Sequence, residues 1–147
     1  MRALSIRLFA ALIAVAAGSA STVAKECYAP DARSQERAFS RAVTTDGGKV
    51  VWLGGQTGSP TASFDEQVHQ IFDELDKTIK AVGGSGLKDM TTMTVFITDP
   101  RLGDRLTQIR KEIFKECFPA SALISVSGLA RPGLLIEIQG TAVVGGK

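Results

Sequence analysis

The chain has 147 residues, of which 17 are basic and 15 acidic, and its formal net charge is +2. Two of the basic residues, Arg2 and Arg7, fall in a predicted cleavable leader, so the remaining chain is formally neutral and contains no block of Lys or Arg. Nucleic-acid binding depends on such concentrations of positive charge. RNA and DNA are therefore poor candidate partners.

Residues 1–24 are predicted to be a removable signal peptide. Arg2 and Arg7 precede the uncharged run 8–17 and a stretch of small residues, 18–24, which is the order of a secretory signal. The apolar run is about half of the roughly 20 residues that a membrane-spanning helix needs. We therefore expect export across the inner membrane, a periplasmic location and no stable membrane anchor. Cleavage after Ala20 and cleavage after Ala24 both satisfy the small-residue preference.

Residues 25–147 are expected to form one domain, since no repeat or long linker divides them. An oxidising compartment allows Cys27 and Cys117 to pair. A disulfide across so long a loop contributes on the order of 4 kcal/mol in the chain-entropy model. The alternative is two unpaired thiols, and the sequence does not decide between them.

The first predicted elements are a hairpin and a helix. Segments 38–44 and 49–53 flank Thr45-Asp46-Gly47-Gly48, a turn-forming sequence that predicts a β-hairpin. Ser63 and Glu66 have the spacing of a capping box ahead of a helix over 64–82. Its apolar stripe has helical periodicity and consists of Val68, Ile71, Phe72, Leu75, Ile79 and Val82.

Three strands and a second helix follow. Residues 90–98 are rich in β-branched side chains and predict a strand. Asp99-Pro100 then supplies an N-cap and a proline for a helix that ends before Phe118-Pro119. Segments 121–127 and 134–144 predict two last strands. The order ββαβαββ favours an α/β (α+β) fold with one sheet and helices on one face. The alternation leaves a half-polar second face, which suits a wet subunit interface.

Few residue clusters point to catalysis. His69 is the only histidine and is expected on a solvated helix face, and the cysteines and carboxylates show no metal-ligand spacing, so no metal site is predicted. The recurring Arg33, Arg37 and Arg41 are expected to decorate a solvated edge, with anion capture as the alternative. Glu137 lies between two isoleucines, and a buried carboxylate needs a partner or a purpose. The alternative places it at an aqueous interface or in an ion pair.

Five segments in order resemble signature segments of the RidA/YjgF family, over about residues 38–144. They are Phe39-Ser-Arg-Ala-Val43, Leu53-Gly-Gly-Gln-Thr-Gly58, Met93-Thr-Val-Phe-Ile-Thr-Asp99, Phe118-Pro-Ala-Ser121 and Leu135-Ile-Glu-Ile138. The resemblance implies a chorismate-mutase-like fold, a homotrimer with pockets between subunits, and cofactor-free hydrolysis of reactive imines and enamines to keto acids and ammonia. The endoribonuclease name attached to this family fits poorly with a neutral, exported chain.

The resemblance also implies site residues. Glu137 matches the glutamate thought to position the attacking water, whereas Ser121 occupies the place of an arginine that clamps the substrate carboxylate. Phe39 stands for a tyrosine, Thr107 falls near a pocket asparagine, and Leu123 replaces a cysteine. The pocket is therefore expected to be less cationic and more apolar. Arg37, Arg41 and Arg131 are the candidates to supply a replacement charge from another direction.

Three functions remain open from the sequence. The first is a pocket that binds a small, less anionic ligand without standard 2-imino acid deamination, since a serine hydroxyl replaces a bidentate guanidinium. The second is an imine or enamine hydrolase in which Glu137 still positions water. The third is a non-catalytic interaction or holdase-like module.

Overall fold

The computed structural model describes residues 24–145, so the predicted signal peptide lies outside the described residues except for Ala24. The strands are β1 Lys25–Tyr28, β2 Ala42–Thr45, β3 Lys49–Thr57, β4 Met90–Ile97, β5 Ala120–Ser125 and β6 Ile136–Val144. The α-helices are α1 Ala32–Glu36, α2 Phe64–Ala81 and α3 Gly103–Phe114, and short 3₁₀ turns, Leu87–Asp89 and Pro100–Leu102, precede β4 and α3. In the described part, no helix is long and apolar enough to cross a membrane.

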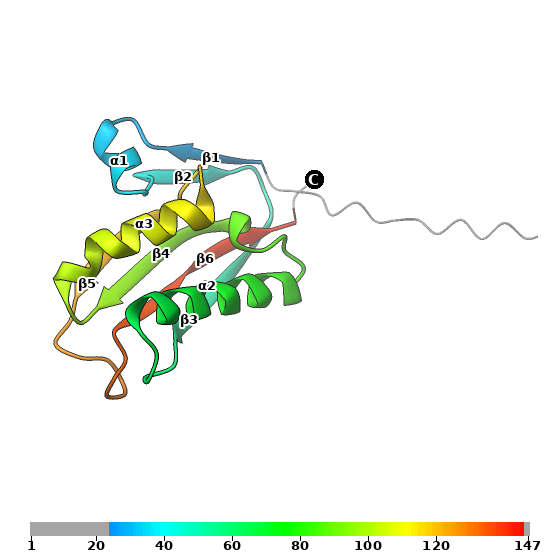
Figure 1. Cartoon of the computed structure of the whole chain (residues 1–147). Helices are drawn as coiled ribbons and strands as arrows, with labels where there is room; N and C mark the ends of the chain where they lie inside the picture. Colours follow the sequence, from blue (N-terminus) through cyan, green and yellow to red (C-terminus); the bar gives the residue numbers. More distant parts are fainter. Residues whose placement is uncertain (1–23, 146–147) are drawn as a thin grey trace, which may run out of the picture.

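The main sheet has four strands in the order β3-β6-β4-β5, with β4 and β5 parallel and the other neighbours antiparallel. Helices α2 and α3 lie side by side over one face of it (Figure 1). The other face, which we call the open face, has no helix of residues 24–145 over it. The predicted mixed α/β architecture with helices on one face is confirmed.

Helix α2 begins where the capping box predicts. The Ser63 hydroxyl accepts a hydrogen bond from the Glu66 amide at 3.4 Å, and the Glu66 carboxylate accepts one from the Ser63 amide at 2.8 Å. These bonds satisfy amide groups that have no partner within the helix. The helix ends at Ala81, one residue before the predicted end, and Gly83 follows with φ of +94°.

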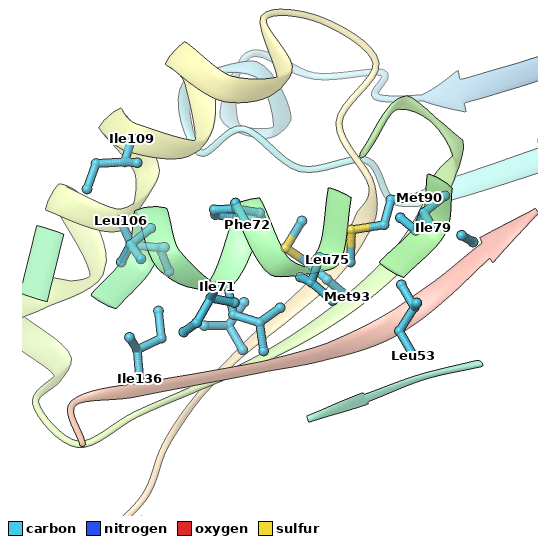
Figure 2. Close-up of a cluster of buried hydrophobic side chains, with 14 of the residues drawn as sticks. Leu53, Ile71, Phe72, Leu75, Ile79, Met90, Met93, Leu106, Ile109 and Ile136 are labelled. Atoms are coloured by element: carbon cyan, nitrogen blue, oxygen red, sulfur yellow. The ribbon is translucent and has the colours of Figure 1, made fainter. Parts of the chain in front are cut away.

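The hydrophobic core lies between the two helices and the sheet. Figure 2 shows side chains of α2 and α3 pointing toward those of β3, β4 and β6. On β4 and β6 the buried residues alternate with residues of the open face, and for β6 the sequence pattern predicts this alternation. The buried members on these two strands include Met93, Val95, Ile97, Ile136 and Ile138.

The predicted hairpin is wrong in its pairing. Gly47 and Gly48 do form a turn with positive φ, but β2 pairs antiparallel with β1, and β3 pairs with β6. Strand β2 has four residues and little apolar surface, so it gains little by docking on the core. Strand β1 and the following α1, which were not predicted, provide the alternative partner.

A disulfide ties this N-terminal ribbon to the rest of the domain. Cys27 on β1 is bonded to Cys117, which follows α3, with 5.2 Å between the Cα atoms and 90 residues between the two positions. Of the two alternatives left open by the sequence, the structure has the paired one. The ribbon is thereby attached beyond the end of α3, and α1 lies near the beginning of that helix, where Arg37 pairs with Asp104 (Figure 1).

Candidate functional site

A hollow of about 270 Å³ opens between α1, α3 and β5. It contains all four residues that the family resemblance implies for ligand binding, and three arginines in addition. We call it the arginine-lined hollow. Its lining residues are Arg33, Arg37, Phe39, Thr107, Arg110, Ser121 and Leu123.

Local structure explains how these side chains meet. Phe39 follows α1 in the segment where Ala38 takes φ of +53°, and the Phe39 amide donates to the Ser34 carbonyl at 3.0 Å. Ser121 pairs in register with Met93, which places it on the helix-covered face of the sheet. Thr107 and Arg110 are three residues apart on α3 and therefore share one side of that helix.

Arg110 is the most deeply placed charge in the hollow, with only 5% of its surface exposed. Its Nη1 donates to Ser121 Oγ at 3.0 Å, and its Nη2 donates to the Arg37 carbonyl at 2.5 Å. Its Nε has no acceptor among the described residues. Burial, with a smaller effect from the positive charge of Arg37, lowers the pKa of Arg110 to about 10.

The other arginines differ from Arg110 in exposure and partners. The Arg37 guanidinium forms an ion pair with Asp104, although its side chain is 40% exposed. Arg33 is exposed at the edge of the hollow. Arg41 instead pairs with Asp31 at 2.6 Å and does not line this hollow.

The expectation of a pocket less cationic than that of the relatives stays a prediction, but the hollow of the described chain is lined by three arginines. Arg33 and Arg37, expected to decorate a solvated edge, line the hollow, and Arg110 joins them. Among the proposed replacement charges, Arg131 lies elsewhere, with its Nη2 3.5 Å from Thr57 Oγ1. Arg110 was missed because an arginine in an amphipathic helix is ordinarily assigned to the solvent face. Its position four residues after Leu106, beside the apolar stripe, is the signal that places it inward.

Glu137 does not line the arginine-lined hollow of its own chain. It lies on β6 opposite Phe96 of β4 and Thr57 of β3, and it is half-buried. A side chain at Gly55 would overlap the Glu137 carboxylate, so glycine there leaves the carboxylate its space. No hydrogen bond or ion pair within residues 24–145 engages that carboxylate.

Buried Gln67 of α2 fixes the start of the strand that carries Glu137. Its side-chain amide donates to the carbonyls of Ala62 and Gly133, at 3.1 and 3.0 Å, and its Oε1 accepts from the Leu135 amide at 2.9 Å. The bonds to Gly133 and Leu135 hold the loop that enters β6, and the bond to Ala62 holds the segment before α2. Because buried polar groups are costly when unpaired, this side chain ties the strand to α2.

Ser121 and Glu137 of one chain lie on opposite faces of the sheet. Ser121 is in register with buried Met93, whereas Glu137 is in register with Phe96, three residues further along β4. Successive residues of a strand point to opposite faces, so these two neighbours of β4 point apart. A single chain therefore cannot place both side chains in one pocket.

No metal site emerges from the described residues, where no three His, Cys, Asp or Glu side chains gather closely enough to hold an ion. His69 is exposed on α2, on the solvated face that the sequence predicts. The chemistry available in the hollow is that of donors: guanidinium groups and the Ser121 hydroxyl.

Comparison with known sequences gives one matching family model, "Endoribonuclease L-PSP", over residues 29–144. Protein DfrA of Myxococcus xanthus is 32% identical over 114 residues, which cover 71% of this chain and 84% of that protein. The human 2-iminobutanoate/2-iminopropanoate deaminase is 28% identical over 114 residues, covering 73% of this chain and 80% of the enzyme.

Solved structures share the fold. A Rid-family protein of unknown function from Yersinia pestis superposes with a TM-score of 0.72 at 22% identity, covering 82% of this chain and 98% of that one. A YjgF/YER057c/UK114-family protein from Mycobacterium tuberculosis gives a TM-score of 0.61 at 23% identity, covering 82% of this chain and 100% of the other. At these identities the likeness is one of architecture.

Proposed function

Because the chain belongs to the endoribonuclease L-PSP family, also called the RidA/YjgF family, we propose that it hydrolyses a small imine or enamine that carries an anionic group. This takes up the second of the three hypotheses from the sequence. The ligand lies in the arginine-lined hollow, and Glu137 of a neighbouring copy positions the water. Hydrolysis then adds water to the C=N bond and releases a carbonyl compound and ammonia.

The observation that carries this proposal is the cationic lining of the hollow. Loss of the arginine at position 121 argued against an anionic substrate, but three other arginines line the same space. Guanidinium groups form short, charge-assisted hydrogen bonds with carboxylates. The relatives named as 2-iminobutanoate/2-iminopropanoate deaminases act on compounds of this kind.

A second copy is needed because Ser121 and Glu137 of one chain lie on opposite faces. The open face that bears Glu137 also exposes apolar side chains, among them Trp52 and Ile124. Large exposed apolar patches mark protein interfaces. We propose that the open face of one subunit meets the hollow of the next in a homotrimer, the assembly that the family resemblance implies.

The direct test measures ammonia release from 2-iminobutanoate generated continuously in the assay. We expect wild-type protein to accelerate hydrolysis and Glu137→Gln to lose about 10²- to 10⁴-fold, the usual contribution of general acid–base catalysis. The matched control is Glu74→Gln, the same change on the exposed surface of α2, which should retain full activity. Equal rates for wild type and Glu137→Gln would exclude this mechanism.

A binding protein without turnover is the second candidate. This candidate is favoured because no residue of the described chain forms a hydrogen bond or an ion pair that would orient the Glu137 carboxylate. The Thr107 hydroxyl also donates locally, to the Gly103 carbonyl at 2.9 Å, and so is engaged within its own helix. This alternative predicts saturable binding of small carboxylates with no release of ammonia from any imine offered.

We also propose that the protein is exported. One support is the order of residues 2–17, in which arginines precede an apolar run. The other is the disulfide, a bond that persists in oxidising compartments. Fractionation of cells that express the full chain tests it. We expect a shortened, periplasmic protein with an N-terminus at Ser21 or Lys25. Full-length protein retained in the cytoplasm would contradict it.

A further inference from the structure

Arg110 is a buried charge with no acid beside it. Four other arginines of the described chain form ion pairs with aspartates, namely Arg37, Arg41, Arg101 and Arg105. Those four are considerably exposed, so their pairing contributes little. Arg110, the buried one, has only two neutral acceptors, Ser121 Oγ and the Arg37 carbonyl.

A buried cation with neutral partners only is unfavourable, because removal from water costs more than two neutral hydrogen bonds return. A small anion in the hollow would offset that cost. The free Nε shows that the hydrogen-bonding capacity of the guanidinium is not exhausted by the protein. The protein provides acceptors for only two of the five N–H donors of this guanidinium, one on Nη1 and one on Nη2. Together with the position of Arg110 in the lining of the hollow, these spare donors point to an acceptor that the chain itself does not provide.

Resting on the proposed function, we infer that Arg110 supplies the carboxylate-recognising group of the hollow, from helix α3, and that Ser121 is small so that this guanidinium fits. The Ser121 hydroxyl accepts from Arg110 Nη1, so its own hydrogen is free to point elsewhere. Ser121 thus acts as a positioning residue for Arg110. It is not a weakened substitute for an arginine.

The size of the hollow suits a small ligand. Its volume of about 270 Å³ is near the lower end of the range of small-molecule sites, about 300 Å³. That accommodates a short carboxylate with a carbonyl or imine carbon and a small side chain. Exposed Arg33 at the edge adds positive charge that favours entry of an anion.

The inference makes Ser121→Arg a decisive variant. If position 121 merely lacks the clamp, an arginine there restores it and strengthens carboxylate binding. If Arg110 already fills the role, a second guanidinium within hydrogen-bond distance of the first repels it and takes up the hollow. We expect Ser121→Arg to bind 2-oxobutanoate at least about tenfold more weakly than wild type, and tighter binding would overturn the inference.

The main experiment compares 2-oxobutanoate with its neutral amide by calorimetry on the mature protein. We expect wild type to prefer the carboxylate by about tenfold or more, the usual worth of a charge-assisted bond. Arg110→Gln should abolish the preference, and Arg105→Gln, an exposed arginine of the same helix, should keep it. A preference that survives Arg110→Gln overturns the inference. Should Arg110→Gln not fold, the Ser121→Arg measurement decides, since it leaves α3 unaltered.

The two proposals fail separately. If the carboxylate preference depends on Arg110 but no imine releases ammonia, the proposed hydrolase activity is rejected and Arg110 is supported as the recognition group. Glu137-dependent hydrolysis with an unchanged carboxylate preference in Arg110→Gln rejects the recognition group and leaves the hydrolase standing.

Discussion

At the scale of single residues, Arg110 shows what a sequence pattern conceals. Leu106 and Ile109 of α3 are apolar and, as helical periodicity indicates, both side chains are buried. Arg110 lies three residues after Thr107 and so shares the side of the helix that faces the hollow, although an arginine in an amphipathic helix is ordinarily expected at the surface. Only the position of β5 beside α3 shows that a small Ser121 leaves room for it. Strand β5 and helix α3 come together only through tertiary packing, so no local sequence pattern indicates that they are neighbours.

The lowered pKa of Arg110 predicts how ligand affinity depends on pH. Only the charged guanidinium binds a carboxylate strongly, and the pKa is about 10 in the free protein. Affinity for 2-oxobutanoate should therefore be constant from pH 7 to 9 and fall by up to about tenfold per pH unit above 10. Other charges facing this group are Arg37, paired with Asp104, and Arg33 at the edge.

Calorimetry between pH 7 and 11 checks this dependence, together with circular dichroism to confirm that the fold persists. The Arg110→Gln variant is the control and should bind weakly with no such fall. An affinity for wild type that declines already between pH 7 and 9 would show that another group recognises the anion.

At the scale of elements, local signals predict what is locally determined. The capping box at Ser63 and the apolar stripe predict the start of α2 and its end to within one residue. Asp99 caps the turn before α3, because its side chain accepts a hydrogen bond from the Arg101 amide at 2.9 Å. The partner of β2 was not predictable in this way. Its choice of β1 over β3 depends on Lys25–Tyr28, a segment for which the sequence predicted no strand, and on the disulfide that Cys27 of this segment forms.

Removal of the disulfide should affect both stability and ligand binding. The bond closes a loop of 90 residues, and loss of a native disulfide from a small secreted domain typically costs 2–5 kcal/mol. It also anchors the ribbon that leads into α1, which brings Arg33 and Arg37 to the hollow. The Cys27→Ser, Cys117→Ser double variant should unfold at lower urea concentration and bind 2-oxobutanoate more weakly.

The matched comparison is wild-type protein with and without a reducing agent. Reduction of the wild type should lower the urea midpoint and weaken 2-oxobutanoate binding, as the double variant does. The reducing agent should change neither quantity in the double variant itself. An oxidised and a reduced wild type with the same urea midpoint and the same affinity would contradict this role of Cys27 and Cys117.

At the scale of the whole molecule, the open face is the feature that one chain leaves unexplained. Trp52 is 81% exposed, and Ile124 and Val50 are 42% and 45% exposed. Strand alternation predicted a half-polar second face, and Glu137 with Gln139 on β6 agrees with it. The sequence could not show that Ser121 lies on the opposite face, because the relative orientation of β5 and β6 depends on their shared neighbour β4.

Trp52→Asp should therefore dissociate the assembly. Aspartate on this face would be buried without a partner in a trimer, which is costly. Light scattering of the eluting protein should give a trimer for wild type and a monomer for the variant. Tyr28→Asp is the control, since Tyr28 is also an exposed aromatic residue, at 60%, but lies on β1. A monomeric wild type would contradict the shared site.

The most direct test of a site built from two chains is complementation between two inactive variants. Arg110→Gln and Glu137→Gln, co-expressed with different tags and purified as mixed trimers, each lack one half of the site. If Arg110 and Glu137 come from neighbouring subunits, every mixed trimer, with two copies of one variant and one of the other, has both intact residues in one of its three sites. We predict that the mixed trimers regain about a third of the wild-type rate of ammonia release from 2-iminobutanoate. Mixed trimers as inactive as either parent, beside an active wild type, would contradict the account.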